Sequence, residues 1–317
     1  MNKDFIYIVS DKHISYVKPV ARKEKSDAEW LAYEKGLLLQ VKEIVQDNLL
    51  LDLGDLIDTG KPFRSQTILN LLVDTAPENY VFMSGNHELF GFAQDIERAM
   101  EEGTLGNLVR SKNLTYLADD TEFNWGKFTI YPFNFKANKT IEHRDVDTNR
   151  VNIAAGHFLS YNTAKLPFFV KENKAWLAKD IIEEFPEFDL FAVGDNHTSF
   201  VVQDKYLSPG SMTRRASSQM KHKPCIWKYD GETLEPIYLK VPDGEDVLTR
   251  EHNDKAKDKK DRGEDFVESV GDIADQTNMP VDIKEGYKKY FNSDKETRAN
   301  TEEMIWELVE RVEENRQ

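Results

Sequence analysis

The stretch LLLDLGDLIDTG, residues 49–60, joins an apolar run to a loop that holds two aspartates and two glycines. A short run of leucines that ends at glycine is typical of a buried β-strand, here over 49–53. Polar side chains directly after such a strand lie at the carboxyl edge of the sheet, where α/β proteins place their functional sites. The stretch therefore predicts a strand that carries Asp55 and Asp58 into a site.

Four more polar clusters follow apolar runs in the same way. They are Asp11-Lys12-His13, Gly85-Asn86-His87-Glu88, Gly156-His157 and Gly194-Asp195-Asn196-His197. Each cluster alone has a plain structural explanation, such as a turn or a helix N-cap. Because all five clusters follow predicted strands, we expect them to meet at one edge of the fold.

The order of apolar runs and amphipathic segments predicts an α/β fold, a four-layer β-sandwich flanked by helices. We expect strands over 5–9, 49–53, 80–83, 128–131, 153–155, 190–193, 225–229 and 234–241. We expect helices over 26–46, 63–74, 92–102 and 171–184. Short apolar runs that alternate with longer helical segments are typical of a layered α/β domain, so we expect the helices outside two packed sheets.

The character of the chain changes after Pro242. We expect a main domain with a small β extension over 1–242, a charged linker over 243–263 and a helical C-terminal appendage over 264–317. Within the appendage, a helix over 294–314 places one apolar stripe, made of Met304, Ile305, Leu308, Val309 and Val312. That stripe packs either on this chain or on a partner protein. The glutamate-rich opposite face argues against membrane binding.

The composition limits the class of protein. The 317 residues carry a formal net charge of −15, and apolar residues make up 39% of the chain, which is typical of a soluble globular protein. No apolar run approaches the roughly 20 residues needed to span a bilayer, and the first residues lack a signal-peptide pattern. The single cysteine, Cys225, excludes an internal disulfide. We therefore expect a cytoplasmic protein.

The residue types in the five clusters suit metal ions. Carboxylate, imidazole and amide groups together favour divalent ions such as manganese, with magnesium as the alternative. A carboxylate such as that of Asp55 can bridge two ions, and two ions about 3.5–4 Å apart can activate a water for phosphoryl displacement. Bound cations would also offset negative charge that opposes contact with nucleic acid. The clusters therefore predict a two-metal phosphoesterase.

Over roughly residues 4–215 the sequence resembles the calcineurin-like metallophosphoesterases, whose pattern is DxH, GDxxDxG, GNH[DE], a histidine after a strand, and GHxH. The resemblance implies a metallophosphoesterase fold and this distribution of ligands: Asp11, His13 and His197 on the first metal, Asn86 and His157 on the second, and Asp55 as the bridge. It also implies that Asp58 supports the bridging loop. His87 would not be a ligand; it would face the scissile phosphate and stabilise or protonate the leaving oxygen.

One position departs from the family pattern. The fifth motif of the family has a histidine where this chain has Asp195. A carboxylate can still bind the second metal, and it would favour harder ions such as manganese or magnesium. The alternative is that Asp195 lies aside and that the second metal site is weak.

Within the superfamily the chain is most similar to the SbcD-type nucleases of DNA double-strand-break processing, of which phage versions are short. The similarity rests on SDKHIS at 10–15, GNHE at 85–88, YLSPGS at 206–211 and the charged linker with its helical tail. It implies a manganese-dependent exonuclease or endonuclease that acts on DNA as a homodimer. The C-terminal helices would bind an SbcC-type coiled-coil ATPase.

Basic residues near the motifs are candidates for contacts with the DNA backbone: Lys18, Arg22, Lys23, Lys25, Arg64, Arg214 and Arg215. Each is equally well explained as solvated surface charge. Two other functions also stay open. A phosphatase acting on a phosphoprotein or a small phosphoester would lack the arginines that protein phosphatases of this superfamily carry, here replaced by Thr59 and Ser84. A binding scaffold with a degenerate site is the third, motivated by Asp195.

Overall fold

The computed structural model describes residues 5–58, 65–89, 92, 95–111, 113–136, 141–163 and 176–251. The chain forms two compact units, Met1–Thr249 and Arg250–Gln317. The expected helical appendage over 264–317, with its helix over 294–314, lies outside the described residues. Among the helices in the described ranges, none combines the length and the apolar character needed to cross a membrane.

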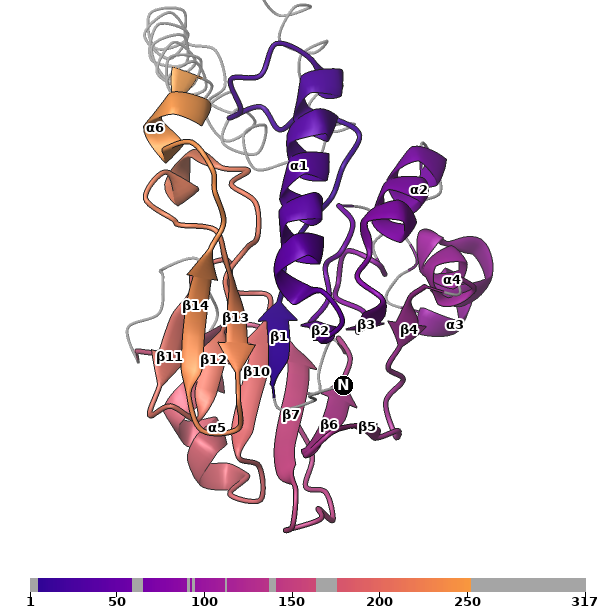
Figure 1. Ribbon diagram of the computed structural model, residues 1–317, viewed down its shortest axis with the longest axis vertical. Helices are drawn as coiled ribbons and strands as arrows, with labels where there is room; N and C mark the ends of the chain where they lie inside the picture. The colour runs from indigo at the N-terminus through magenta and orange to yellow at the C-terminus, as the bar shows by residue number, and fades with distance from the viewer. Residues whose placement is uncertain are drawn as a thin grey trace, which may run out of the picture. The chain divides into compact units, whose positions relative to one another are not determined.

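The first sheet has six strands, and those at its centre are almost entirely buried; Figure 1 labels its strands. In spatial order the strands are β14 (Leu234–Tyr238), β13 (Cys225–Tyr229), β1 (Ile6–Val9), β2 (Leu49–Asp52), β3 (Asn79–Phe82) and β4 (Thr115–Tyr116). Strands β1 to β4 are parallel, while β13 runs antiparallel to both β1 and β14. Parallel pairing of β1, β2 and β3 brings the first three polar clusters to one edge.

The second sheet also has six strands and carries the other two clusters. In spatial order they are β11 (Phe200–Val202), β12 (Tyr206–Ser208), β10 (Leu190–Gly194), β7 (Val151–His157), β6 (Phe128–Phe133) and β5 (Phe123–Trp125). β7 and β10 are parallel, with Gly194 beside His157, so the fourth and fifth clusters are neighbours. A separate two-stranded sheet pairs β8 (Ser160–Tyr161) with β9 (Trp176–Leu177).

Alternation along the strands divides the core into layers. In β1, Ile6 and Ile8 join the core between the two sheets, while Tyr7 and Val9 join the core under the helices. The helices α1 (Asp27–Val45), α2 (Ser65–Thr75), α3 (Ile96–Glu102) and α4 (Thr104–Val109) contribute to this second core, and α5 (Ala178–Glu184) packs on the other sheet. The arrangement confirms the expected four-layer sandwich flanked by helices.

Most expected elements are present, with some differences at their ends. The expected helix over 92–102 begins at Ile96, because Asp95 caps it by accepting from the Arg98 amide. The described part of the helix expected over 171–184 begins at Ala178, and the strand expected over 234–241 ends at Tyr238. The first compact unit includes 243–249, the start of the expected linker, where the short helix α6 (Gly244–Val247) lies. The amide of Lys23 donates to the Val247 carbonyl there.

A buried polar triad ties the three central strands together beneath the first cluster. Lys12 lies 2.5 Å (Nζ to Oδ2) from Asp52 and donates to the Tyr80 hydroxyl at 2.6 Å. The Tyr80 hydroxyl in turn donates to Asp52 at 2.6 Å. All three side chains are buried, so each charge or dipole has its partner inside the protein. The triad fixes the loop that carries Asp11 and His13 to β2 and β3.

We expect the substitution Asp52→Asn to lower the free energy of unfolding by about 3–5 kcal/mol, because it leaves the buried Lys12 ammonium without a counter-ion. Urea unfolding followed by circular dichroism measures the change. Asp74→Asn, at an exposed carboxylate of α2, is the matched control and should change the value by less than about 0.5 kcal/mol. Equal stability of the two variants would contradict this role of the triad.

Candidate metal centre

The loops that carry the clusters continue the pairing of the strands. Beyond β1 and β2, the amide of Asp11 donates to the Gly54 carbonyl at 3.1 Å, and the amide of His13 donates to the Asp55 carbonyl at 2.8 Å. The next pair joins the Ile14 amide to the Leu56 carbonyl at 2.9 Å. Main-chain hydrogen bonds, rather than side-chain contacts, therefore bring the first two clusters side by side.

Four of the predicted metal ligands adopt an uncommon backbone conformation. Asp11, His13, Asp55 and Asp195 have φ values of 52°, 47°, 54° and 81°. This left-handed region costs about 1–3 kcal/mol for a residue with a side chain and persists only where the surroundings impose it. They are four of the eight described non-glycine residues with positive φ, so at these four positions the fold holds side chains against their local preference.

The glycines of the second and third clusters let two loops touch. A Cβ on Gly54, which has a φ of +108°, would lie 2.7 Å from the Gly85 nitrogen and 2.8 Å from His157 Nδ1. A Cβ on Gly85 would lie 2.1 Å from Asp55 Oδ1. Neither contact is tolerated, so only glycine fits at these two positions. This close approach seats Asp55 between the loops.

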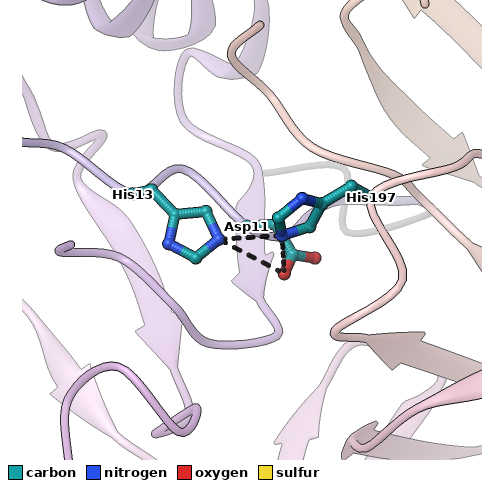
Figure 2. A group of neighbouring side chains, drawn as sticks. All are labelled: Asp11, His13 and His197. Atoms are coloured by element: carbon teal, nitrogen blue, oxygen red, sulfur yellow. Dashed lines mark hydrogen bonds and ion pairs between the residues drawn. The ribbon is translucent and has the colours of Figure 1, made fainter. Parts of the chain in front are cut away.

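The first group of ligand atoms comes from the first and fifth clusters. Asp11, His13 and His197 point toward one another (Figure 2). The Nε2 atoms of His13 and His197 are 3.0 Å apart, and Asp11 Oδ1 lies 3.8 Å and 3.7 Å from them. Ligands that share one ion at about 2.1 Å are themselves roughly 3–3.5 Å apart. The spacing of these three atoms is close to that range.

The second group is joined to the first by Asp55. Its Oδ2 lies 3.6 Å from His13 Nε2 and 3.4 Å from His157 Nε2, so one carboxylate faces both groups. Asn86 Oδ1 lies 3.3 Å from His157 Nε2. His157 Nδ1 donates to the Leu53 carbonyl at 2.8 Å, which directs Nε2 toward Asp55. The structure thus brings Asp55, Asn86 and His157 together as the sequence predicts.

The electrostatics of the cluster favour a cation. Asp11 Oδ1 is buried without a hydrogen-bond partner among the described residues. Burial, with a contribution from Asp55, raises the pKa of Asp11 to about 6, and burial also raises the pKa of Asp195 to about 6. Burial disfavours a charged imidazole at His157, but Asp55 and Asp11 outweigh it and hold the pKa of His157 well above its usual range. In the metal-free protein, a proton on His157 therefore supplies positive charge that a bound metal ion would otherwise supply.

Asp195 is the predicted ligand for which the structure gives the least direct support. Its amide donates to Asp11 Oδ2 at 3.2 Å, so its backbone lies against the first group. Its carboxylate is near enough to raise the pKa of His157, yet it belongs to no three-residue ligand group among the described residues. The side chain of Asn196, next in the chain, turns away and donates to the Ser160 carbonyl at 2.7 Å. Asp195 as a ligand stays a prediction.

Glu88 is a residue whose role the sequence analysis missed. Its buried carboxylate accepts from the amides of Gly85 at 2.7 Å, Asp55 at 2.9 Å and Ile57 at 3.1 Å. It therefore clamps the second and third clusters to each other from behind the ligands. Residues 86–89 form a turn, which presents the Glu88 carboxylate to these amides. The signal available was an acidic residue directly after a GNH sequence.

His87 lies beside these two groups, and with His13 and Asp58 it forms a third set of atoms close enough together to hold an ion. Its ring packs edge-on against His13 with centroids 4.4 Å apart, and its Nδ1 donates to the Asp58 carbonyl at 2.7 Å. Asp58 also accepts from Arg215 Nη2 at 2.9 Å. Arg215 Nη1 in turn donates to the His13 carbonyl and to Ser15 Oγ at 3.0 Å. Asp58 and Arg215 thus hold the loops that orient His87 and His13.

The proposed DNA contacts need correction at two positions. Arg22 and Arg214 are buried, and Arg22 pairs with Glu24 while Arg214 donates to the carbonyls of His222 and Pro242. These two guanidinium groups are used inside the protein, because their cation must be paired once it is removed from water. Other candidates remain near the surface: Lys18 is half-buried, and Lys23 and Lys25 are exposed. Arg64 lies outside the described residues.

We expect metal binding to release protons and to strengthen as the pH rises from about 6 to 8. His157 has a raised pKa and holds a proton in the metal-free protein, whereas a metal ligand must be the neutral imidazole. Isothermal titration with Mn²⁺ in buffers of different ionisation enthalpy measures the release. His143→Ala, at an exposed histidine, should leave the pH dependence unchanged. An affinity independent of pH would contradict the assignment of His157.

We expect Glu88→Gln to weaken Mn²⁺ binding by about 10–100-fold, as is usual for residues that orient metal ligands. A glutamine offers one acceptor oxygen to the three amides, and its NH₂ group opposes at least one of them. Isothermal titration with Mn²⁺ measures the affinity, and Glu43→Gln on the exposed face of α1 is the control. Parental affinity in the Glu88 variant would refute its role as a clamp.

Solved structures resemble this chain at low sequence identity. Vacuolar protein sorting 29 from Cryptosporidium parvum is 15% identical over 76% of this chain and 93% of its own, with a TM-score of 0.35. TT1561 of Thermus thermophilus is 12% identical over 74% and 98%, with a TM-score of 0.42. A protein serine/threonine phosphatase from Saccharomyces cerevisiae is 11% identical over 76% and 82%, with a TM-score of 0.38.

A family model places the chain more firmly. A search of curated proteins found no match. The model of the calcineurin-like phosphoesterases, in contrast, matches residues 6–249, a span that contains all five clusters and both sheets. The convergence of carboxylate, imidazole and amide groups on Asp55 agrees with that match. The chain belongs to the calcineurin-like phosphoesterase family, whose typical members bind two divalent metal ions and hydrolyse phosphoesters.

Proposed function

We propose that the protein is a manganese-dependent DNA nuclease of the SbcD type, which hydrolyses phosphodiester bonds during double-strand-break processing. The observation that carries the proposal is the place of His87, beside both ligand groups and oriented by the Asp58 carbonyl. When bound, the two metal ions supply an activated water and stabilise negative charge on the phosphate. His87 is then placed to stabilise or protonate the leaving 3′ oxygen.

The surroundings of the site favour a phosphodiester over a phosphomonoester. A monoester dianion is usually held by arginine, which offers a bidentate contact. Ser84, at one of the arginine positions of protein phosphatases, is buried and bonds through its amide and hydroxyl to Asn134 Oδ1 at 2.7 Å and 3.0 Å. Arg215 is bound to Asp58 and to the His13 carbonyl. A phosphodiester carries a single negative charge and therefore depends less on arginine contacts.

The SbcD-type assignment draws further support from the segment at 206–211. Ser208 Oγ contacts the carbonyls of Asn196 and Thr198 at 3.3 Å, and the Ser211 amide donates to the His197 carbonyl at 3.2 Å. The segment therefore holds the loop that presents His197. As part of the proposal, the protein forms a homodimer and its C-terminal residues bind an SbcC-type ATPase. Co-purification with that ATPase, with and without residues 252–317, tests the latter.

We expect the purified protein to degrade linear DNA in the presence of Mn²⁺, and His87→Ala to lower kcat by about 10²–10⁴-fold. The variant should still bind Mn²⁺, since His87 is assigned no ligand role. Gel analysis of labelled DNA, with and without chelator, measures the activity. His143→Ala, an exposed histidine paired with Glu187, is the matched control.

Other outcomes point to other functions. A His87→Ala variant as active as the parent would overturn the role assigned to this side chain. Strong turnover of phosphopeptides without DNA cleavage would favour a phosphatase of the same family. If calorimetry finds no divalent-ion binding and Asp55→Asn changes nothing, the chain is a scaffold that keeps the fold without the chemistry.

A further inference from the structure

A pocket opens directly beside the candidate metal centre, with His197 in its wall. Its volume is about 650 Å³, within the range of sites that hold ligands of nucleotide size. The loop of the fifth cluster, β11, the short 3₁₀ helix at Ser217–Gln219, the loop that follows it, and β13 and β14 supply the lining. β13 and β14 are neighbours in the first sheet, and β11 is the edge strand of the second sheet. A molecule in the pocket would therefore be continuous with one bound at the metal centre.

The charge of the pocket is opposite to that of the chain. The chain carries a net charge of −15, yet Lys221 and Lys223 line the pocket and no described lining residue is acidic. The two other large described pockets are lined by carboxylates, including Asp145 and Glu101. A basic pocket on an acidic protein selects anions, and it stands beside the residues expected to bind the phosphate.

The lysines of the pocket are presented on an anchored loop. His222, between them, donates through Nε2 to the Ser211 carbonyl at 2.6 Å, and its own carbonyl accepts from Arg214 Nε at 2.6 Å. Lys221 and Lys223 are exposed, and neither forms an ion pair or hydrogen bond with a described residue. Their ammonium groups are available to a ligand, while the backbone between them is held in place.

Aromatic rings line the same pocket. Phe200 is stacked on Tyr206, and Trp227 is buried, so these two form a rigid wall. Tyr238 is different, because 59% of it is exposed although it is a large aromatic residue on a strand. Lysines that contact phosphates, alternating with rings on which bases stack, are the features by which proteins bind single-stranded nucleic acid.

We propose that this pocket binds the nucleotides that flank the scissile phosphate in a single-stranded segment of the substrate, with Lys221 and Lys223 on the phosphates and a base stacked on Tyr238. The inference rests on the proposed nuclease function and deepens it. It implies that the enzyme holds the strand on the His197 side of the metal centre. A small phosphodiester reaches only the metal centre and makes no use of the pocket.

The test combines binding with cleavage. Fluorescence anisotropy of a labelled single-stranded oligonucleotide, with Ca²⁺ in place of Mn²⁺, is measured from about 50 to 200 mM salt. Lys221→Ala/Lys223→Ala should reduce the slope of log affinity against log salt by about 1.4, since each phosphate contact in a single strand contributes about 0.7. Tyr238→Leu should weaken binding by at least about fivefold, while Tyr238→Phe keeps the ring and the affinity.

Cleavage gives the second readout, as the ratio of kcat/KM on the oligonucleotide to kcat/KM on bis-p-nitrophenyl phosphate. This ratio should fall in the lysine and Tyr238→Leu variants. Lys179→Ala/Lys205→Ala removes the same charge elsewhere on the surface and should leave both ratio and salt slope unchanged.

The outcomes separate the pocket from the proposed function. If the pocket variants keep the parent's affinity, salt slope and ratio of kcat/KM values, the proposed pocket is wrong. The proposed nuclease function is not affected by that result. Pocket-dependent binding without cleavage by the parent would support the pocket and refute the nuclease. A parent that neither binds nor cleaves the oligonucleotide would refute both.

Discussion

The burial of carboxylates away from water is the constraint on which this structure depends. Asp11 and Asp55 are fully buried and form one cluster with Asp195, in which burial, and then the charge of the neighbouring carboxylates, raises the pKa of Asp11 and of Asp195. Such a cluster is stable only with positive charge among the oxygens. The imidazole of His157 can supply one such charge, and two metal ions supply more. The family match and the distances around Asp55 point to the same conclusion from independent observations.

The fold meets this constraint with a second set of buried polar groups behind the ligands. Glu88 accepts three main-chain amides and so fixes the loops of the second and third clusters. Lys12, between two ligand residues, reaches down to Asp52 and Tyr80. These groups bind no metal in the arrangement described. They lower the entropy cost of ordering the ligands, because the ligand loops are already held before an ion arrives.

Much of the fold and of the candidate site could be predicted from the sequence, because the sequence signals for them are local. The runs before Asp11, Asp55 and His157 are apolar enough to identify buried strands, and polar residues at the ends of parallel strands must share an edge. Strands such as β4 and β8 were not predicted, because two residues carry no readable periodicity.

Side-chain direction was also out of reach of the sequence. Arg22 and Arg214 look like surface cations in the sequence, and only the packing shows that they point inward. The clamp at Glu88 depends on three amides from two separate loops, a contact that no spacing along the chain reveals. The placement of Asp195 is set in the same way, by long-range packing.

The first two ligand loops are paired through their main chains, and this pairing separates the choice of metal ligand from the stability of the loop that carries the ligand. The hydrogen bonds that align Asp11 with Gly54 and His13 with Asp55 are made by main-chain amides and carbonyls, so they do not depend on the ligand atoms of Asp11, His13 or Asp55. Exchange of one ligand type for another in these two loops would then alter the preference for one ion over another without removing those hydrogen bonds.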